Sequence, residues 1–281
     1  MPARLVPAFA LALAAGPAVA ECASDARIAG FVADWKAKQP TEALSAGGSM
    51  EDALCTQGKL VSRLAFSEGR PVGYKAGLTS KPAQERFGVS EPVRGVLLSG
   101  MLLDDGATVP AAFGARPLFE ADLLLVVGGA PINEVATSEA AMGEGAAVGP
   151  FIELPHPTLA EGEPLDGVTI TAMNVGARLG VMGAEIPVAD AAAMQAALED
   201  MTVRVTDAEG TEIGSAGGDA VLGHPVNSLL WLVGEGVALK AGDLVSVGSI
   251  GALMPPAKAG GKATVTYEGL PGDPSVSVTF R

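Results

Sequence analysis

The feature that most constrains the fold of this chain is a change in sequence texture near residue 70. From there to the C-terminus, short runs rich in Val, Ile, Thr and Leu are separated by Gly and Pro. The runs are residues 118–128, 167–176, 201–210, 242–250, 262–269 and 275–280. Short strands bounded by turn residues predict a mainly β core. Patches with helical spacing, at 134–147, 188–199 and 225–234, lack the regular alternation of a doubly wound sheet, so we expect an α+β fold.

The segment before residue 70 has the periodicity of helices instead. Apolar residues recur at the spacing of one helical face at Ile28, Phe31, Val32 and Trp35. This spacing predicts a helix from residue 25 to about residue 38, which Pro40 ends. A second helix is predicted from Ser49, whose side chain can cap it, to beyond Leu64. We therefore expect a helical N-terminal portion, residues 21–70, and a β-rich domain, residues 71–281.

The first twenty residues, MPARLVPAFALALAAGPAVA, have the pattern of a secretory signal peptide. Arg4 precedes an apolar stretch, and Ala18-Val19-Ala20 fits the small-residue cleavage rule. Two prolines interrupt the stretch, whereas a membrane helix needs about 20 apolar residues in a row. A lipid-anchored cysteine would follow a small residue, but Cys22 follows Glu21. We expect cleavage before Glu21 and a periplasmic or secreted protein without membrane attachment.

Charge and cysteine content narrow the partners and the compartment. The chain has 18 Lys and Arg against 32 Asp and Glu, a net charge of −14. So acidic a protein repels phosphate backbones and anionic membranes, so we expect no nucleic-acid partner. Disulfides persist outside the cytosol, so we expect Cys22 and Cys55 to be bridged. The alternative is a pair of free or buried thiols.

Three acidic residues in apolar surroundings are candidates for a metal site. Glu120 and Asp122 are two positions apart in a predicted strand, so both side chains lie on one face. Glu153 stands between apolar neighbours after a turn expected at Gly149-Pro150. Three convergent carboxylates form an all-oxygen site suited to Mg²⁺ or Mn²⁺. Spacing alone also allows a solvated face of an edge strand.

Lys75 lies between Gly73 and Gly77 in the uncharged run PVGYKAGLTS. We expect the flanking glycines to let the backbone turn tightly, so that the ammonium group points inward at an anionic ligand. An inward lysine can balance the charge of the carboxylates or carry a proton. The alternative is a surface lysine in a turn.

A set of motifs follows in a fixed order from about residue 49 to the C-terminus. The first is GYKAGLTS, residues 73–80, followed by Gln84, Gly88-Val89 and Pro92. Glu120-x-Asp122 and Glu153 come next, followed by Asn174, Gly183, Gly223-x-Pro225, residues 230–232, residues 241–249 and residues 275–278. In this order the motifs resemble those of the 2-keto-4-pentenoate hydratase branch of the fumarylacetoacetate hydrolase superfamily.

The resemblance implies a mixed β-roll core, a homo-oligomer, and a metal-dependent lyase that acts on small 2-oxo or 2-hydroxydienoate acids. Residues at the matching positions are Glu120, Asp122 and Glu153 for the metal, Lys75 for catalysis, and Asn174, Gly248 and Ser249 for the substrate. The hydroxyl group of Ser249 can donate to a substrate carboxylate, although an ordinary turn serine is the alternative.

Two positions depart from the family's pattern. Asp122 stands where the family has the second Glu of its E-x-E motif, so this ligand is one methylene shorter. Val93 stands where such hydratases commonly have an Asp that assists proton transfer, and valine has no proton to exchange. Glu91, Arg94 and His156 are the candidate substitutes.

Two other functions therefore stay open beside hydration. One is an exported protein that binds 2-oxo acids with this fold but turns them over little, which Val93 and the export signal favour. The other is decarboxylation or acylpyruvate hydrolysis, which differs from hydration in the bond that breaks and not in the machinery.

Overall fold

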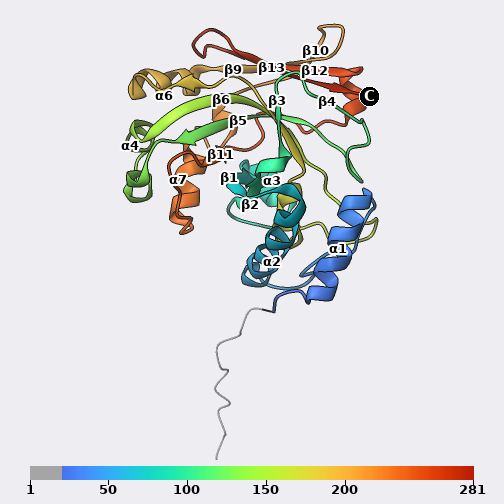
Figure 1. Ribbon diagram of the computed structural model, residues 1–281. Helices are drawn as coiled ribbons and strands as arrows, with labels where there is room; N and C mark the ends of the chain where they lie inside the picture. Colours follow the sequence, from blue (N-terminus) through green and yellow to red (C-terminus); the bar gives the residue numbers. More distant parts are fainter. Residues whose placement is uncertain (1–20) are drawn as a thin grey trace, which may run out of the picture.

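The computed structural model describes residues 21–281, so the predicted signal peptide, residues 1–20, lies outside the described residues. Two β-sheets packed face to face form the body of the molecule, and the helices α1 and α2 cover one end of the larger sheet (Figure 1). None of the helices within residues 21–281 combines the length and the apolar character needed to cross a membrane.

The helices are mostly short. The α-helices are α1 (Asp25–Ala37), α2 (Met50–Glu68), α3 (Lys81–Arg86), α4 (Ser138–Gly143), α5 (Gly167–Ala172), α6 (Ala191–Asp200) and α7 (Val226–Gly234). The 3-10 helices are η1 (Ser99–Met101), η2 (Ala130–Glu134), η3 (Asn174–Gly176), η4 (Gly218–Ala220) and η5 (Pro256–Ala259).

The larger sheet is mixed and has the order β2-β1-β11-β5-β6-β7-β3, with β8 paired to β6. Its strands are β1 (Pro71–Gly77), β2 (Val93–Leu98), β3 (Leu102–Asp104), β5 (Glu120–Val127), β6 (Gly145–Leu154), β7 (Leu179–Met182), β8 (Ile186–Pro187) and β11 (Leu244–Ser246). The pairs β1–β11 and β3–β7 are parallel, and the remaining pairs of this sheet are antiparallel.

The smaller sheet has the order β10-β9-β12-β13-β4 and lies over β5 and β6 (Figure 1). Its strands are β4 (Thr108–Val109), β9 (Thr202–Thr206), β10 (Glu212–Gly217), β12 (Lys262–Glu268) and β13 (Ser275–Phe280). Since β13 joins β4 in parallel and its other neighbour in antiparallel, this sheet is mixed as well. The prediction of an α+β fold with a mixed β core is confirmed.

Two apolar clusters hold these parts together. One lies between the sheets and includes Leu123 and Val148 from the larger sheet and Val265 from the smaller. The other joins the N-terminal helices to the larger sheet, where Trp35 and Leu60 pack in one cluster with Leu98 of β2. Because of this shared cluster, α1 and α2 support the β1–β2 edge of the sheet.

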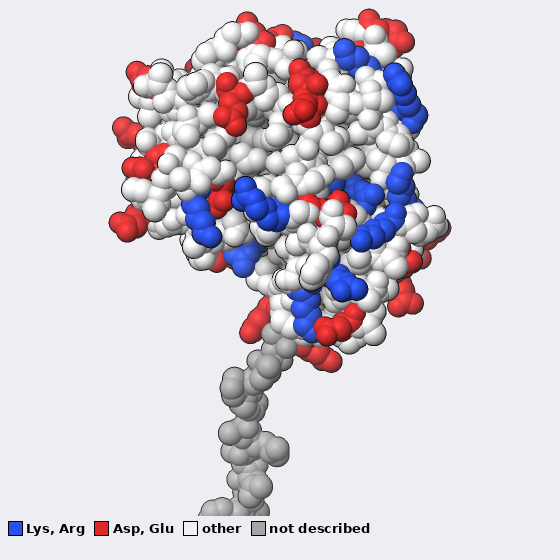
Figure 2. All heavy atoms as spheres, viewed as in Figure 1, with Lys and Arg blue, Asp and Glu red and all other residues white. Residues whose placement is uncertain are grey.

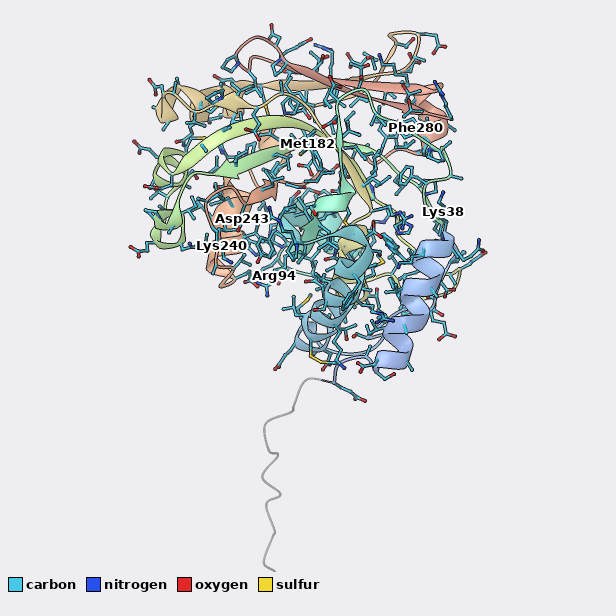
Figure 3. The ribbon with its side chains drawn as sticks, viewed as in Figure 1. Lys38, Arg94, Met182, Lys240, Asp243 and Phe280 are labelled. Atoms are coloured by element: carbon cyan, nitrogen blue, oxygen red, sulfur yellow. A yellow bond between two sulfur atoms is a disulfide. The ribbon has the colours of Figure 1, made fainter. Side chains whose placement is uncertain are left out.

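The N-terminal helices form where the sequence predicts them. The Ser24 side chain accepts from the N–H of Arg27 at the start of α1, and Lys38 ends that helix in the left-handed region. Ser49 and Asp52 form a capping box at the start of α2. Cys22 and Cys55 are joined by a disulfide with Cα atoms 5.3 Å apart, as predicted (Figure 3). Closing a loop of this length contributes between about 3 and 5 kcal/mol in the chain-entropy model.

Two predictions of a helix or a strand are wrong. Residues 167–176 are not a strand, because Asp166 and Thr169 form a capping box that starts α5, and this local bonding outweighs the β propensity of the Val, Ile and Thr residues. The helix expected at 134–147 is confined to α4, and residues from Gly145 onward belong to β6.

The surface is acidic in total but unevenly charged. On the face in Figure 2, Lys and Arg side chains form a band across the middle, with some Asp and Glu side chains among them, while Asp and Glu dominate the left rim. A local positive band raises the concentration of small anions near that face.

Candidate active site

The register between β5 and β6 brings the predicted acids together. Glu120 on β5 is directly opposite Glu153 on β6, and Asp122 is opposite Phe151. Strand alternation puts Glu120 and Asp122 on the same face. The turn expected at Gly149-Pro150 is wrong, because both residues lie within β6. The pairing of two strands, and not a turn, therefore sets the position of Glu153.

The three carboxylates are close and buried. Each offers an oxygen within 4.8 Å of those of the other two, and their exposed fractions are 6% for Glu120, 0% for Asp122 and 2% for Glu153. The Oε2 atoms of Glu120 and Glu153 have no hydrogen-bond partner among the described residues. Buried unpartnered carboxylate oxygens are costly unless a cation binds them. The alternative of a solvated edge-strand face is therefore excluded.

The pKa shifts of these carboxyl groups also favour a bound cation. Burial raises the pKa of Glu120 well above its usual range, and the neighbouring Glu153 raises it further. Burial, followed by the charge of Glu153, raises the pKa of Asp122 to about 7, although hydrogen bonds from Ser246 and Leu123 act in the opposite direction. A divalent cation would favour the ionised form of all three and has the hard character that carboxylate oxygens bind. The residues present therefore fit such an ion.

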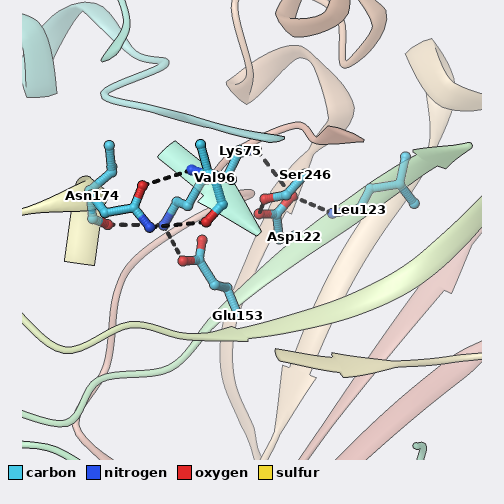
Figure 4. A network of polar contacts seen from close by, with 9 residues as sticks. Lys75, Val96, Asp122, Leu123, Glu153, Asn174 and Ser246 are labelled. Carbon is cyan, nitrogen blue, oxygen red and sulfur yellow. Dashed lines mark hydrogen bonds and ion pairs between the residues drawn. The ribbon is translucent and has the colours of Figure 1, made fainter. Parts of the chain in front are cut away.

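Lys75 lies beside the carboxylates and is 3% exposed. Its Nζ atom forms an ion pair with Glu153 Oε1 and donates to the carbonyl oxygen of Val175 at 3.1 Å (Figure 4). The alternative of a surface lysine is excluded. Lys75 thus offsets part of the negative charge of the site.

The glycines near Lys75 act differently from the prediction. Gly73, Lys75 and Gly77 lie in strand β1, so the expected tight turn is wrong. A Cβ atom at Gly73 would lie 2.0 Å from the Leu244 carbonyl oxygen, so the missing side chain lets β11 approach. Opposite Lys75, a Cβ at Gly95 would lie 2.9 Å from the lysine Cγ, so Gly95 leaves room for the lysine side chain. Sequence reasoning missed this role of Gly95.

Asp122 has partners that the sequence analysis did not identify. Its Oδ1 atom accepts from the N–H groups of Leu123 at 2.6 Å and Gly248 at 3.0 Å, and its Oδ2 accepts from the hydroxyl of Ser246 (Figure 4). The Tyr267 hydroxyl bonds to the carbonyl oxygens of Asp122 and Phe151 and bridges β5 and β6. A serine in the apolar run Leu244-Val245-Ser246-Val247 was the available signal.

Asn174 lies close to Lys75 but uses its side chain on the backbone. Its Oδ1 accepts from the N–H of Val96 at 2.8 Å, and its Nδ2 donates to the Val96 carbonyl at 2.9 Å. These bonds fix η3 to β2 and hold the Val175 carbonyl that Lys75 meets. The predicted contact between Asn174 and a substrate stays a prediction.

Gly248 and Ser249 follow β11. Gly248 has a φ of 107°, and a Cβ there would lie 2.7 Å from Thr79 Oγ1, so the position needs glycine. Its N–H donates to Asp122 Oδ1 at 3.0 Å, while the Ser249 hydroxyl donates to the carbonyl of Gly251 at 2.9 Å. This bond is the one expected of a turn serine, and the substrate contacts of both residues stay predictions.

Val93 lies on the face of β2 that Lys75 crosses, two positions before Gly95. It is buried in the cluster of the N-terminal helices. Glu91 is exposed. Arg94 bonds to the Glu235 carbonyl near the end of α7 and lies on the opposite face of β2 from Gly95 and Lys75. Neither residue therefore replaces the Asp that the family has at position 93.

His156 is fully buried three residues after Glu153. Its Nδ1 atom accepts from the N–H of Ala115 at 3.3 Å, and its ring packs edge-on against Trp35, with the ring centres 5.6 Å apart. Burial, helped by the charge of Arg178, lowers the pKa of His156 to about 3. A histidine that stays neutral in this packing is a structural residue and a poor proton carrier.

Two cavities lie apart from these residues. One of about 660 Å³ lies at the surface along α1 and α2 and is lined by residues such as Lys59 and Phe66. The other, of about 290 Å³, borders Tyr74 and Arg94 on the opposite face of β1 and β2 from Lys75. The carboxylates line neither cavity, so the chemistry of the site and not cavity size identifies it.

Comparison with known proteins agrees with this geometry. The chain is 31% identical over 257 residues to 2-keto-4-pentenoate hydratase 1 of Dechloromonas aromatica, which covers 88% of this chain and 93% of that protein. It is 28% identical over 228 residues to 2-hydroxyhexa-2,4-dienoate hydratase of Comamonas testosteroni, which covers 79% and 84%. No protein-family model matches the chain.

The fold has solved counterparts. The structure of 4-oxalocrotonate decarboxylase from Pseudomonas putida G7, complexed with magnesium and adipate, matches with a TM-score of 0.77 and 22% sequence identity. The match covers 91% of this chain and 96% of that chain. The mixed β architecture is thus that of the fumarylacetoacetate hydrolase superfamily. Within it, the chain belongs to the 2-keto-4-pentenoate hydratase family.

Proposed function

We propose that this chain is a metal-dependent lyase that adds water to a conjugated double bond of a small 2-hydroxydienoate or 2-oxo acid. The observation that carries the proposal is the group of three buried carboxylates with Lys75 beside it. The names of the hydratase relatives support the reaction and the class of substrate. The net charge of −14 disfavours nucleic acid as the substrate.

The cation of this proposal is Mg²⁺ or Mn²⁺, held by Glu120, Asp122 and Glu153. All donor atoms are carboxylate oxygens, which favours a hard divalent ion over zinc or copper. The magnesium in the related decarboxylase structure supports the choice. When bound, such an ion supplies Lewis-acid charge that orients a 2-oxo carboxylate and stabilises an enolate.

Lys75 contributes charge and a proton donor. Its ammonium group has three N–H donors, of which Glu153 and the Val175 carbonyl take two. The third has no partner within residues 21–281, so it can bond a substrate oxygen or deliver a proton at the Nζ atom. Burial by β1, β2 and η3 keeps water away from this group and strengthens its interaction with an anion.

Two alternatives keep specific support. The structural match to 4-oxalocrotonate decarboxylase favours decarboxylation by the same site, and acylpyruvate hydrolysis belongs to the same group of reactions. Val93, which has no proton to exchange, favours a protein that binds 2-oxo acids and turns them over slowly. All three functions use the same carboxylates.

One set of assays separates these functions. The protein is incubated with 2-hydroxypenta-2,4-dienoate, 4-oxalocrotonate or an acylpyruvate, with Mn²⁺ or with a chelator. We expect metal-dependent loss of the dienoate absorbance with incorporation of water. Release of carbon dioxide or carbon–carbon cleavage would select the alternative reactions. Clear oxalate binding without turnover of any substrate would select the binding protein.

We further propose that the mature chain is exported and assembles as a homo-oligomer. The Cys22–Cys55 bridge supports an oxidising compartment, although the leader lies outside the described residues. The homo-oligomer is what the resemblance to the hydratase family implies. N-terminal sequencing of the exported protein and light scattering after size-exclusion chromatography test these two points.

A further inference from the structure

Asp122 differs from the other two acids in how it is held. Glu120 and Glu153 each have a buried oxygen without a partner, whereas both oxygens of Asp122 accept hydrogen bonds. The donors are the N–H groups of Leu123 and Gly248 and the hydroxyl of Ser246. A carboxylate has about four lone-pair positions, so three donors leave one position for a cation.

Ser246 reaches Asp122 because of the strand order. Strand β11 lies between β1 and β5, with Ser246 paired to Lys75 on one side and to Leu124 on the other. Asp122 is two residues from Leu124, which makes it the diagonal neighbour of Ser246 on the same face. Ser246 is 0% exposed, so its hydroxyl has Asp122 and not water as its partner.

The short side chain of Asp122 explains why there is room for the hydrogen bond from Ser246. The β5–β6 pairing fixes the backbone of residue 122, and an aspartate there reaches about 1.5 Å less far than a glutamate would. A glutamate at position 122 would extend into the space that the Ser246 hydroxyl occupies. Exchanging Asp and Ser for Glu and Ala keeps the number of side-chain atoms, and volume-conserving exchanges are tolerated best in a packed interior.

We propose that Asp122 and Ser246 form one unit in which Ser246 is the positioning residue for a short carboxylate. The serine hydroxyl fixes the rotamer of the short aspartate so that its remaining lone pair faces Glu120 and Glu153. This inference rests on the proposed metal centre and concerns how this chain builds it.

The test measures Mn²⁺ affinity by calorimetric titration, without substrate. Ser246→Ala should weaken binding about 10- to 100-fold, as loss of a hydrogen-bond partner of a metal ligand typically does. Asp122→Glu alone should also weaken it, because the longer side chain is crowded by Ser246. The double variant Asp122→Glu/Ser246→Ala should recover most of the loss, so that the two single effects do not add.

Ser228→Ala is the matched control. Ser228 is also 0% exposed, but its hydroxyl donates to the Val247 carbonyl at 2.6 Å and not to a carboxylate. Its loss should leave Mn²⁺ affinity unchanged. Thermal melting of each metal-free variant shows whether it folds, and the comparison of Asp122→Glu with the double variant is decisive even if Ser246→Ala does not fold.

The outcomes distinguish failure of the Asp122–Ser246 proposal, called the pairing here, from failure of the proposed metal centre. If Glu120→Gln abolishes binding while Ser246→Ala binds like Ser228→Ala, the metal centre stands and the pairing is wrong. A double variant that binds no better than Asp122→Glu also overturns the pairing. If Glu120→Gln binds Mn²⁺ as tightly as the parent, the metal centre itself fails, and the pairing fails with it.

Discussion

Glu120 and Glu153 face each other directly across the antiparallel pair β5–β6, in the interior of the larger sheet. Like charges in directly opposed positions destabilise a sheet, and burial increases their repulsion. A cation between the two side chains would offset this repulsion and stabilise the folded protein. The predictions below start from this relationship.

Replacing Glu120 with glutamine should remove Mn²⁺ binding and stabilise the metal-free protein. The first effect follows from the loss of a charged ligand. The loss of metal affinity should exceed the 10- to 100-fold that is typical when a hydrogen-bond partner of a metal ligand is removed. The second follows because the repulsion from Glu153 disappears. Titration calorimetry and thermal melting measure the two effects. The exposed residue Glu199 on α6 provides the control Glu199→Gln, and equal behaviour of both variants would speak against the site.

Metal affinity should rise with pH through about 7. Burial raises the folded-state pKa of Asp122 to about 7, and the ion binds the deprotonated form. For the metal-free protein the sign is opposite: a raised carboxyl pKa means that stability is lost as pH increases from about 4 to about 7.

Titrations with Mn²⁺ at pH 6 and pH 8, together with melting curves of the metal-free protein, check both signs. Asp122→Asn should flatten the part of the pH dependence that comes from this carboxyl group. Equal Mn²⁺ affinity at the two pH values would contradict the raised pKa.

Lys75→Met should leave the metal bound but weaken a 2-oxo acid analogue such as oxalate. A hydrogen bond to a charged group is worth about 1.5 to 3 kcal/mol, so binding should weaken about 10- to 100-fold. Lys59→Met is the matched control, because Lys59 pairs with Asp25 on the surface of the N-terminal helices. Oxalate binding that is unchanged in Lys75→Met would make Lys75 a structural residue.

Val93→Asp should increase hydratase turnover. The parent should turn over slowly, because general acid or base assistance is typically worth about 10² to 10⁴ in rate and Val93 cannot give it. The new carboxyl group would lie on the face of β2 that Lys75 crosses. The measurement is the rate of dienoate loss with saturating Mn²⁺. A parent rate on the order of 10 per second, typical of an efficient enzyme, would show that an acid at this position is dispensable.

The sequence was informative where structure is local. The cap Ser49 and the apolar spacing of α1 predicted both N-terminal helices closely, because helix ends depend on neighbouring residues. Local reasoning also explains an error, since the capping box of Asp166 and Thr169 was present in the sequence but residues 167–176 were read as a strand.

The site was predictable in its residues but not in its construction. The motif order identified Glu120, Asp122, Glu153 and Lys75, which the structure brings together. The roles of Gly95 and Ser246 depend on which strands are neighbours and in what register, and residues 122 and 246 meet only through that pairing. Spacing along the chain carries no such information.

The most direct test of the account is a crystal structure of the mature protein with Mn²⁺ and oxalate, with the metal located by its anomalous scattering. The account predicts one Mn²⁺ ion bound by oxygens of Glu120, Asp122 and Glu153, with oxalate on the ion and Lys75 Nζ within hydrogen-bond distance of an oxalate oxygen. An anomalous map without a peak among these three carboxylates, at Mn²⁺ concentrations that saturate binding in solution, would contradict it.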